Sequence, residues 1–198
     1  WVAVNWFLIL KLVKNKYRRS AHQQRKSLSD EEHLTLSLTI QENFLRSISL
    51  GGTQNIALYM PANNEVSLEL LNKEADIFNK ISLPVIKPNK QLQFIRPKTD
   101  CKFALNQFNI LEPTEGEEVE VNSHDLIIVP SVGVDKNGFR LGYGGGYYDR
   151  MLADQKNLLN GPLLIGLLFS FQKIDAAFGE SHDMKFDHVF TELGEERF

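Results

Sequence analysis

The chain of 198 residues contains a single cysteine, Cys101, and therefore cannot form an intrachain disulfide bond. Scarce cysteine is typical of a protein from a reducing compartment, and we expect a cytoplasmic location. Nothing beside Cys101 in the sequence suggests an activating base, so we do not expect it to be a catalytic nucleophile. The five histidines lack the spacing of a zinc site, and no zinc is expected.

Acidic side chains are absent from residues 1–28, which carry seven basic ones. The rest of the chain carries 15 basic and 25 acidic side chains, a balance of −10, and the whole chain has a net charge of −3. A basic arm suits a membrane, a nucleic acid, a phosphorylated ligand or simply a solvated helix face. We favour the solvated face for most of these side chains, and we expect no nucleic-acid and no membrane partner.

Long hydrophobic runs are also absent. The apolar stretch at residues 1–13, WVAVNWFLILKLV, is too short to cross a bilayer as a helix. It also lacks the basic leading region and the small-residue cleavage site of a secretory signal. A helix packed on the core, a processed end and sequence upstream of a start site all fit this stretch. We therefore expect an apolar N-terminal extension at residues 1–13, whose role the sequence leaves open, and a single domain at residues 14–198.

Short apolar runs alternate with segments of helical spacing. Ser29 and Glu32 form a capping box that starts a helix, and Gly51 and Gly52 end it. Further helices are expected over residues 66–79 and 147–159, and the acidic stretch 113–122 is expected to be a loop. We expect strands at residues 56–60, 83–86, 92–95, 126–129, 163–169 and 189–191.

This alternation predicts an α/β fold, a single layered domain with a mostly parallel, Rossmann-like (NagB/RpiA-like) central sheet flanked by helices. Ligands of such folds bind beyond the carboxyl ends of the strands. The turn after Met60 and the loop after Val129 both lie at such ends. We therefore expect the functional site where these two segments meet.

A glycine-rich loop follows the strand at residues 126–129, in the sequence DLIIVPSVGVDKNGFRLGYGGGYYDR at residues 125–150. Glycines let the backbone approach phosphate oxygens, and amides at a helix start point at negative charge. Arg140 adds a fork for phosphate, and Asp149 offers an oxygen ligand to Mg²⁺. The loop is neither a Walker loop nor a dinucleotide fingerprint. A tight strand-to-helix turn without a ligand is the structural alternative for Gly144, Gly145 and Gly146.

The order Arg-Leu-Gly-Tyr-Gly-Gly-Gly-Tyr-Tyr-Asp-Arg at residues 140–150 resembles the signature of the 5-formyltetrahydrofolate cyclo-ligase family, and the similarity extends from Lys14 to the last strand. The resemblance implies a ligase that converts 5-formyltetrahydrofolate to 5,10-methenyltetrahydrofolate, with ATP and Mg²⁺ as cofactors. It implies that the ATP γ-phosphoryl group activates the formyl oxygen and that N10 then attacks the activated carbon, releasing ADP and phosphate. We expect no covalent enzyme intermediate.

The resemblance also implies roles for individual residues. Arg140 and Tyr147 are the expected catalytic residues. Basic Lys14 and Arg18, four residues apart on one helix face, are expected at the nucleotide phosphates. Many relatives carry a lysine where Gly145 stands. This chain lacks that charge, so Lys14, Arg18 and Arg140 are left to neutralise the phosphates. The expected ATP-binding residues are Lys14, Arg18, Arg140, Leu141, Gly142, Tyr143, Gly144, Gly145, Gly146, Tyr147 and Tyr148.

By the same resemblance, a carboxylate at Glu65 suits the N–H donors of a pteridine ring. Glu65 also suits the start of a helix, and Phe108 suits a plain core position as well as a stacking one. Asp149 and Asp187 are the expected magnesium ligands. The expected substrate-binding residues are Met60, Glu65, Phe108, Tyr143, Gly144, Gly145, Gly146 and Tyr147.

Two other functions compete with this interpretation. One is a different ATP-using or sugar-phosphate enzyme, for which Met60 and Glu65 have no role. The other is a non-catalytic nucleotide or nucleic-acid binder that uses the basic arm, for which Asp187 has no role. We favour the cyclo-ligase, acting as a monomer on a folate that carries a glutamate or polyglutamate tail.

Overall fold

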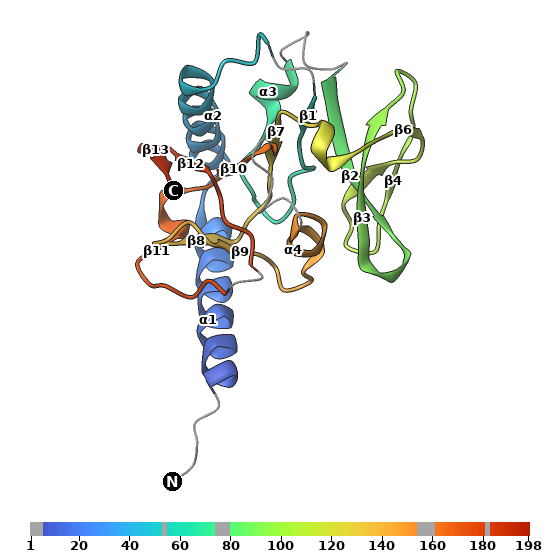
Figure 1. Ribbon diagram of the computed structural model, residues 1–198. Helices are drawn as coiled ribbons and strands as arrows, with labels where there is room; N and C mark the ends of the chain where they lie inside the picture. Colours follow the sequence, from blue (N-terminus) through green and yellow to red (C-terminus); the bar gives the residue numbers. More distant parts are fainter. Residues whose placement is uncertain (1–5, 53–54, 74–79, 154–160, 181–182) are drawn as a thin grey trace.

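The computed structural model describes residues 6–52, 55–73, 80–153, 161–180 and 183–198. It confirms the predicted α/β fold, with a central sheet that is mostly parallel and flanked by helices (Figure 1). The main helices are α1 (Trp6–Ser27), α2 (Asp30–Ser47), α3 (Glu69–Lys73) and α4 (Tyr147–Met151). Within the described residues, no helix is long and apolar enough to cross a membrane.

Helix α2 begins as the sequence predicts. The Ser29 hydroxyl accepts from the amide of Glu32 at 3.2 Å, and the Glu32 carboxylate accepts from the amide of Ser29 at 2.8 Å. The helix ends before the two glycines, at Ser47. Helix α1 runs without a break through the boundary expected between residues 13 and 14, so the described part of the apolar stretch is its first turns.

Eight strands form the sheet, in the order β13-β12-β10-β7-β1-β2-β3-β6. The five strands from β12 to β2 are parallel, whereas β13 at one edge and β3 at the other run antiparallel to them, and β6 pairs antiparallel with β3. Parallel strands buried between two layers explain why the apolar runs are nearly continuous. The bounds are β1 (Ile56–Ala57), β2 (Ile81–Lys87), β3 (Gln91–Pro97), β6 (Gly116–Val119), β7 (Leu126–Ile128), β10 (Leu163–Leu167), β12 (His188–Thr191) and β13 (Gly194–Arg197).

Successive residues of the central strands feed two separate hydrophobic clusters. Leu126 and Ile128 of β7 join the cluster under α2, where Phe44 lies edge-on to Phe190 with ring centroids 5.5 Å apart. Ile127, between them, joins the cluster on the opposite face. This alternation is the two-residue period of a strand with both faces buried. The sheet is thereby fixed rigidly, and the loops at its carboxyl end are held in place.

Several expected elements differ from the observed ones. The stretch 113–122, expected to be a loop, contains β6 and a short 3-10 helix, η3 (Val121–Ser123), because β6 is an acidic, largely exposed strand held by pairing with β3. The first strand is shorter than expected, and α3 begins three residues late. Residues 74–79 and 154–160, which complete two expected helices, lie outside the described residues.

Two small sheets were not predicted. Strands β4 (Phe103–Leu105) and β5 (Leu111–Pro113) form a hairpin with Phe108 in its connecting turn. Strands β8 (Gly133–Asp135), β9 (Arg140–Leu141) and β11 (Lys173–Ile174) form the other, in the order β11-β8-β9. The glycine loop therefore follows β9 rather than the buried strand β7.

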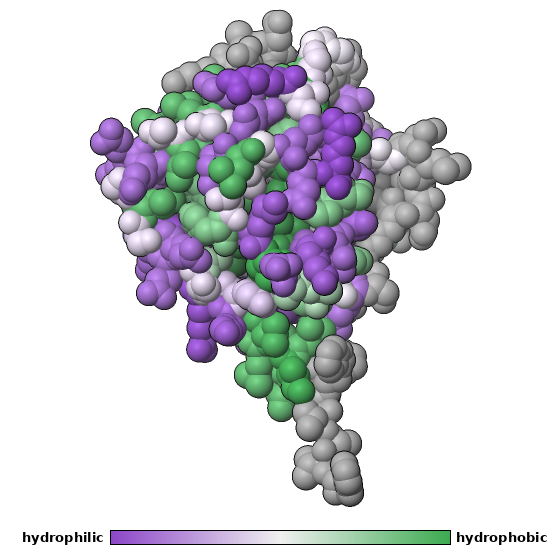
Figure 2. Space-filling view, turned by 90° about the vertical axis from the view of Figure 1, so that its left-hand side faces the viewer, coloured by the Kyte–Doolittle hydropathy of each residue, from purple (hydrophilic) through white to green (hydrophobic). Residues whose placement is uncertain are grey.

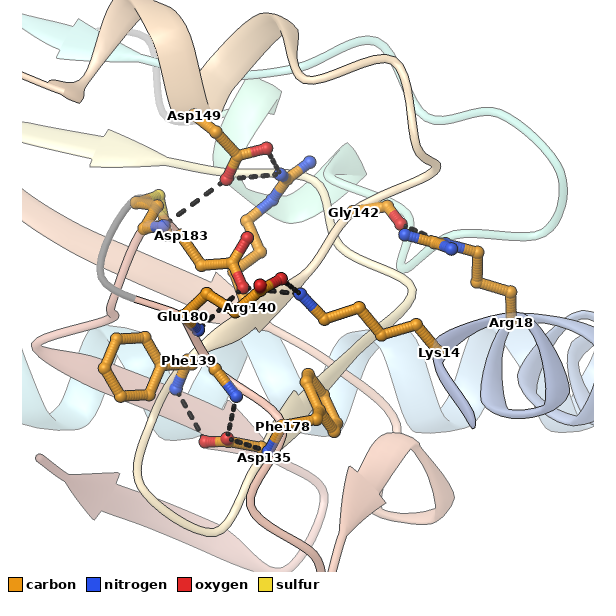
Figure 3. A network of polar contacts seen from close by, with 12 residues as sticks. Lys14, Arg18, Asp135, Phe139, Arg140, Gly142, Asp149, Phe178, Glu180 and Asp183 are labelled. Atoms are coloured by element: carbon orange, nitrogen blue, oxygen red, sulfur yellow. Dashed lines mark hydrogen bonds and ion pairs between the residues drawn. The ribbon is translucent and has the colours of Figure 1, made fainter. Parts of the chain in front are cut away.

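Asp135, at the end of β8, anchors this second sheet. Its buried carboxylate accepts four main-chain amides at 2.9–3.0 Å, from Asn137, Phe139, Phe178 and Gly179. Figure 3 shows the bonds from Phe139 and Phe178. We expect Asp135→Ala to lower the free energy of unfolding by about 3 kcal/mol or more, because it leaves buried donors unpaired. Chemical denaturation measures this loss, and a change below about 0.5 kcal/mol contradicts the assignment.

Candidate active site

The glycine loop joins β9 to α4 through backbone conformations that require glycine. Gly144 and Gly146 have φ values of +99° and +67°, in the region that side chains other than glycine rarely adopt. A Cβ atom on Gly145 would lie 2.8 Å from the Tyr147 ring. The residue types of the loop thus follow from its shape, which leads the chain into α4 at Tyr147.

Arg140 lies beneath this loop and is only 6% exposed. Its Nε donates to the carbonyl oxygen of Pro130 at 2.9 Å, and its Nη1 lies 3.3 Å from the Asp149 carboxylate. The guanidinium also lies over the Tyr148 ring, 5.4 Å from its centroid. Arg140 therefore connects the end of β7, the glycine loop and the first turn of α4.

Helix α1 brings two further cations to the same loop, as Figure 3 shows. The Nζ of Lys14 lies 2.9 Å from Glu180 and 2.7 Å from Asp183. Burial alone would lower the pKa of Lys14, but its hydrogen bonds to Asp183 and Glu180 raise that pKa above its ordinary value. Arg18 donates through Nε to the carbonyl oxygen of Gly142 at 2.8 Å, and burial lowers its pKa.

A cleft of about 550 Å³ opens along this face of α1. Its walls combine apolar residues from the first turns of the helix with Lys14, Arg18, Tyr143 and Gly144. Figure 2 shows apolar side chains gathered at the projecting end of the molecule, where α1 begins. The exposed large apolar residues in these turns are Leu8, Ile9 and Leu12.

The structure separates the two carboxylates expected to bind magnesium. Asp149 lies in the first turn of α4, where it contacts Arg140 and accepts from the amide of Met184 at 3.4 Å. Asp187 precedes β12, and its carboxylate accepts from the amide of Leu164 at 2.7 Å, at the amino-terminal ends of the parallel strands. It is Asp183, rather than Asp187, that the chain brings to Lys14 beside Asp149.

A second, narrower cavity of about 270 Å³ lies on the other side of the glycine loop. Aromatic and aliphatic side chains line it, together with Glu65, Arg140 and the backbone of Gly145 and Gly146. Phe108 reaches it from the β4–β5 turn and meets Tyr147 edge-on, with ring centroids 6.0 Å apart. Met60, expected here, is not among the lining residues and packs against the core instead.

Beyond Phe108 and Tyr147 the cavity continues into a wider cleft of about 700 Å³. The last residue of β2, Lys87, and Lys90 in the turn before β3 line this cleft. Arg150 holds the turn near the glycine loop, because its Nη2 donates both to Lys90 O at 3.1 Å and to Gly145 O at 3.0 Å. The narrow cavity thus opens outward toward two cations.

Glu65 is the buried acid of the narrow cavity, at 7% exposure. Its Oε1 accepts from the Tyr143 hydroxyl at 2.6 Å and its Oε2 from the amide of Ala62 at 3.0 Å. Burial raises the pKa of Glu65, whereas these two hydrogen bonds oppose the rise. The Tyr143 hydroxyl in turn accepts from Nη2 of Arg25 at 2.8 Å, a residue that the sequence interpretation left among the solvated charges.

Most of the predicted site residues therefore meet around one loop. Tyr143 lines both the basic cleft and the narrow cavity, so the two are neighbours across its ring. Among the residues that the structure describes, no group of three histidine, cysteine, aspartate or glutamate side chains is ready to hold a metal ion. A cation here would need ligands from a bound molecule as well as from Asp149.

Comparisons with known proteins find relatives over most of the chain. The mouse 5-formyltetrahydrofolate cyclo-ligase is 31% identical over 192 residues, covering 90% of this chain and 93% of that protein. The Haemophilus influenzae enzyme of the same name is 30% identical over 167 residues, covering 82% and 88%. The solution structure of the Aquifex aeolicus 5,10-methenyltetrahydrofolate synthetase superposes with a TM-score of 0.78 at 31% identity, covering 93% and 92%.

The sequence model of one family, described as the 5-formyltetrahydrofolate cyclo-ligase family, matches residues 11–192. The match spans the narrow cavity, the charged residues of the basic cleft and the five parallel strands of the central sheet. The chain therefore belongs to the 5-formyltetrahydrofolate cyclo-ligase family, whose reaction converts 5-formyltetrahydrofolate to 5,10-methenyltetrahydrofolate.

Proposed function

We propose that this cyclo-ligase uses ATP and Mg²⁺, that ATP binds in the basic cleft, and that the folate binds in the narrow cavity. The observation that carries the proposal is the glycine loop between the two, with Tyr143 lining both. Such an arrangement brings a triphosphate end and a pteridine to opposite sides of one short segment. Proximity of this kind is the main contribution that a protein makes to phosphoryl transfer.

The residues in and beside the cleft fit a triphosphate. Lys14, Arg18 and Arg140 supply positive charge from α1 and from beneath the loop, and the glycines permit close approach of phosphate oxygens. The loop from Leu141 to Tyr148 provides the main-chain contacts in this proposal. ATP would supply the phosphoryl group that turns the formyl oxygen into a leaving group.

The residues also fit Mg²⁺, with one change of ligand. Asp149 lies in the first turn of α4, paired with Arg140 beside the glycine loop, and Mg²⁺ commonly uses one or two carboxylates together with substrate phosphates. We propose Asp183 as the second carboxylate in place of Asp187, because Asp183 lies beside Lys14 and next to Met184, whose amide contacts Asp149. When bound, the ion would neutralise charge on the phosphates.

The narrow cavity fits the folate. Glu65 would accept N–H groups of the pteridine, while Phe108 and Tyr147 would pack against its rings. Lys87 and Lys90 in the outer cleft suit the carboxylates of a glutamate or polyglutamate tail. Arg140, which lines the cavity and also binds Asp149, would neutralise the transferred phosphoryl group, and Tyr147 would orient the formyl group beside it. The monomeric state and the cytoplasmic location stay predictions from the sequence.

A spectroscopic turnover assay tests the proposal. The protein is mixed with 5-formyltetrahydrofolate, ATP and Mg²⁺, and the near-ultraviolet band of methenyltetrahydrofolate is followed. We expect the band to grow and to stop growing when ATP or Mg²⁺ is withheld. A flat trace from folded protein that binds ATP would contradict the proposal and favour a different substrate on the same phosphate-binding fold.

The hairpin that carries Phe108 gives a further prediction. Phe108→Ala is expected to raise KM for 5-formyltetrahydrofolate roughly 10-fold, because one ring face of the cavity is lost, and to leave KM for ATP unchanged. Phe108 is 53% exposed, so the fold should persist. Phe103→Ala, on the same hairpin and 41% exposed, is the matched control and should leave both constants unchanged. Equal effects of the two variants would contradict the assigned contact.

A further inference from the structure

A buried arginine stands behind the acid of the narrow cavity. Arg25 of α1 is 1% exposed, and its Nη2 donates to the Tyr143 hydroxyl at 2.8 Å. That hydroxyl donates onward to Oε1 of Glu65 at 2.6 Å, and Arg25 Nη1 lies 3.9 Å from the same oxygen. The three side chains thus form one relay, Arg25 to Tyr143 to Glu65, of which Tyr143 and Glu65 line the cavity.

Packing alone does not explain why an arginine is buried here. Nε and Nη1 of Arg25 are buried and have no hydrogen-bond partner among the described residues. Buried donors without partners cost stability, and apolar side chains of similar volume usually serve a core better than a buried ion pair. A charge kept under these conditions needs a reason beyond packing, and the nearest negative group is Glu65.

Glu65 needs such a partner because its surroundings oppose its charge. Burial raises the pKa of its carboxyl group, and opposing contributions come from Tyr143, the Ala62 amide, Arg25 and Arg140. Tyr59 and Tyr148 also face it, and both are buried with a raised pKa of their own. His33 contacts the main-chain oxygen of Glu65 rather than its carboxylate. Arg25 and Arg140 are therefore the cations that favour the ionised form.

Arg25 also joins three segments that are far apart in sequence. The side chain of Asn64 donates to the main-chain oxygen of Arg25 at 3.2 Å, which ties α1 to the turn that carries Glu65. The guanidinium lies over the Tyr143 ring, 5.6 Å from its centroid, which ties α1 to the glycine loop. The same helix carries Lys14 and Arg18 at the basic cleft.

We propose that Arg25 is a positioning residue for the folate, which holds the carboxylate of Glu65 and the hydroxyl of Tyr143 in the arrangement that receives the pteridine N–H groups. The proposal rests on the function proposed above, and it assigns a role in substrate recognition to a residue of α1 outside the expected site. Arg25 acts through the other two residues and does not itself line the cavity.

Arg25→Met tests the proposal. We expect KM for 5-formyltetrahydrofolate to rise roughly 10- to 100-fold, as on loss of one partner of a buried charge, with KM for ATP within about 2-fold. The rise should be larger at pH 6 than at pH 8.5, because loss of the cation moves the titration of Glu65 upward and leaves less carboxylate at the lower pH. Arg19→Met, at an exposed position of the same helix, is the matched control and should change neither constant.

Combination with Glu65→Gln separates positioning from folding. If Arg25 acts through the charge of Glu65, adding Arg25→Met to Glu65→Gln should raise the folate KM by less than about 3-fold and remove the pH dependence. Should Arg25→Met fail to fold, this double variant and Arg25→Lys, which keeps the charge without the planar fork, carry the test. The proposal is overturned if the double variant raises the folate KM by the product of the two single effects. It is also overturned if Arg25→Met raises KM for folate and KM for ATP equally. An inactive native protein would instead overturn the proposed function.

Discussion

Replacement of Arg140 by methionine is expected to lower kcat/KM by about 1,000-fold or more, the effect of removing a cation from a phosphoryl-transfer site. The other two cations are differently engaged, since Lys14 pairs with Glu180 and Asp183 and Arg18 binds Gly142. Arg140 alone of the three lines the narrow cavity, and it also contacts Asp149. Steady-state kinetics with varied ATP and folate measure the loss.

Two controls accompany this prediction. Arg46→Met removes an arginine that is 70% exposed on α2, and should leave kcat/KM unchanged. Arg140→Lys keeps the charge but loses the fork that joins Pro130 and Asp149, and should recover only a small part of the activity. Thermal unfolding shows whether the loop has lost its anchor. Activity of folded Arg140→Met within about 10-fold of the native value would contradict the assigned role.

The second large effect concerns the metal. Asp183→Asn is expected to lower kcat roughly 100-fold at a fixed Mg²⁺ concentration and to raise the Mg²⁺ concentration needed for half-maximal rate. Asp187→Asn is the matched substitution, four residues along the chain. Because its carboxylate binds the Leu164 amide, we expect a small loss of thermal stability and a rate within about 3-fold of the native one.

The pair of variants decides between two ligand sets. A Mg²⁺ titration of each variant gives the half-maximal concentration, and Asp149→Asn serves as the positive control because both sets include Asp149. If Asp187→Asn raises the half-maximal Mg²⁺ concentration and Asp183→Asn does not, the metal ligands are Asp149 and Asp187, as the sequence predicts. Loss of folding in Asp183→Asn would be visible in the unfolding curve, and Asp183→Glu then carries the test.

Much of the fold followed from local patterns. The capping box at Ser29 and the continuous apolar runs of β7 and β10 each predict their element from neighbouring residues alone. Strand β6 has no such signal, because its first three residues are exposed and it exists through pairing with β3, about twenty residues away. The β8–β9 hairpin was missed for a similar reason, since Asp135 stabilises it through amides from the distant Phe178 and Gly179.

The site shows the same limit. The glycine loop and Arg140 were predicted because their residue types are unusual in that order, and the positive φ values of Gly144 and Gly146 explain those types. Arg25 gave no signal, since its burial depends on segments 39 and 118 positions away. Asp183 and Asp187 are only four residues apart, so the sequence alone does not distinguish them as ligands. In the structure Asp183 contacts Lys14, whereas Asp187 accepts from the amide of Leu164.

If ATP binds in the basic cleft as proposed, the ion pairs of Lys14 bear on which form of the nucleotide the cleft would prefer. Glu180 and Asp183 balance the lysine, so the cleft presents acid as well as base to an approaching triphosphate. A bare triphosphate would take the lysine and leave two carboxylates facing its own negative charge. A triphosphate with a bound divalent cation would let those carboxylates pair with the cation in place of the lysine. The cleft would therefore favour the metal-bound nucleotide by charge balance, before any contact with the base or the sugar.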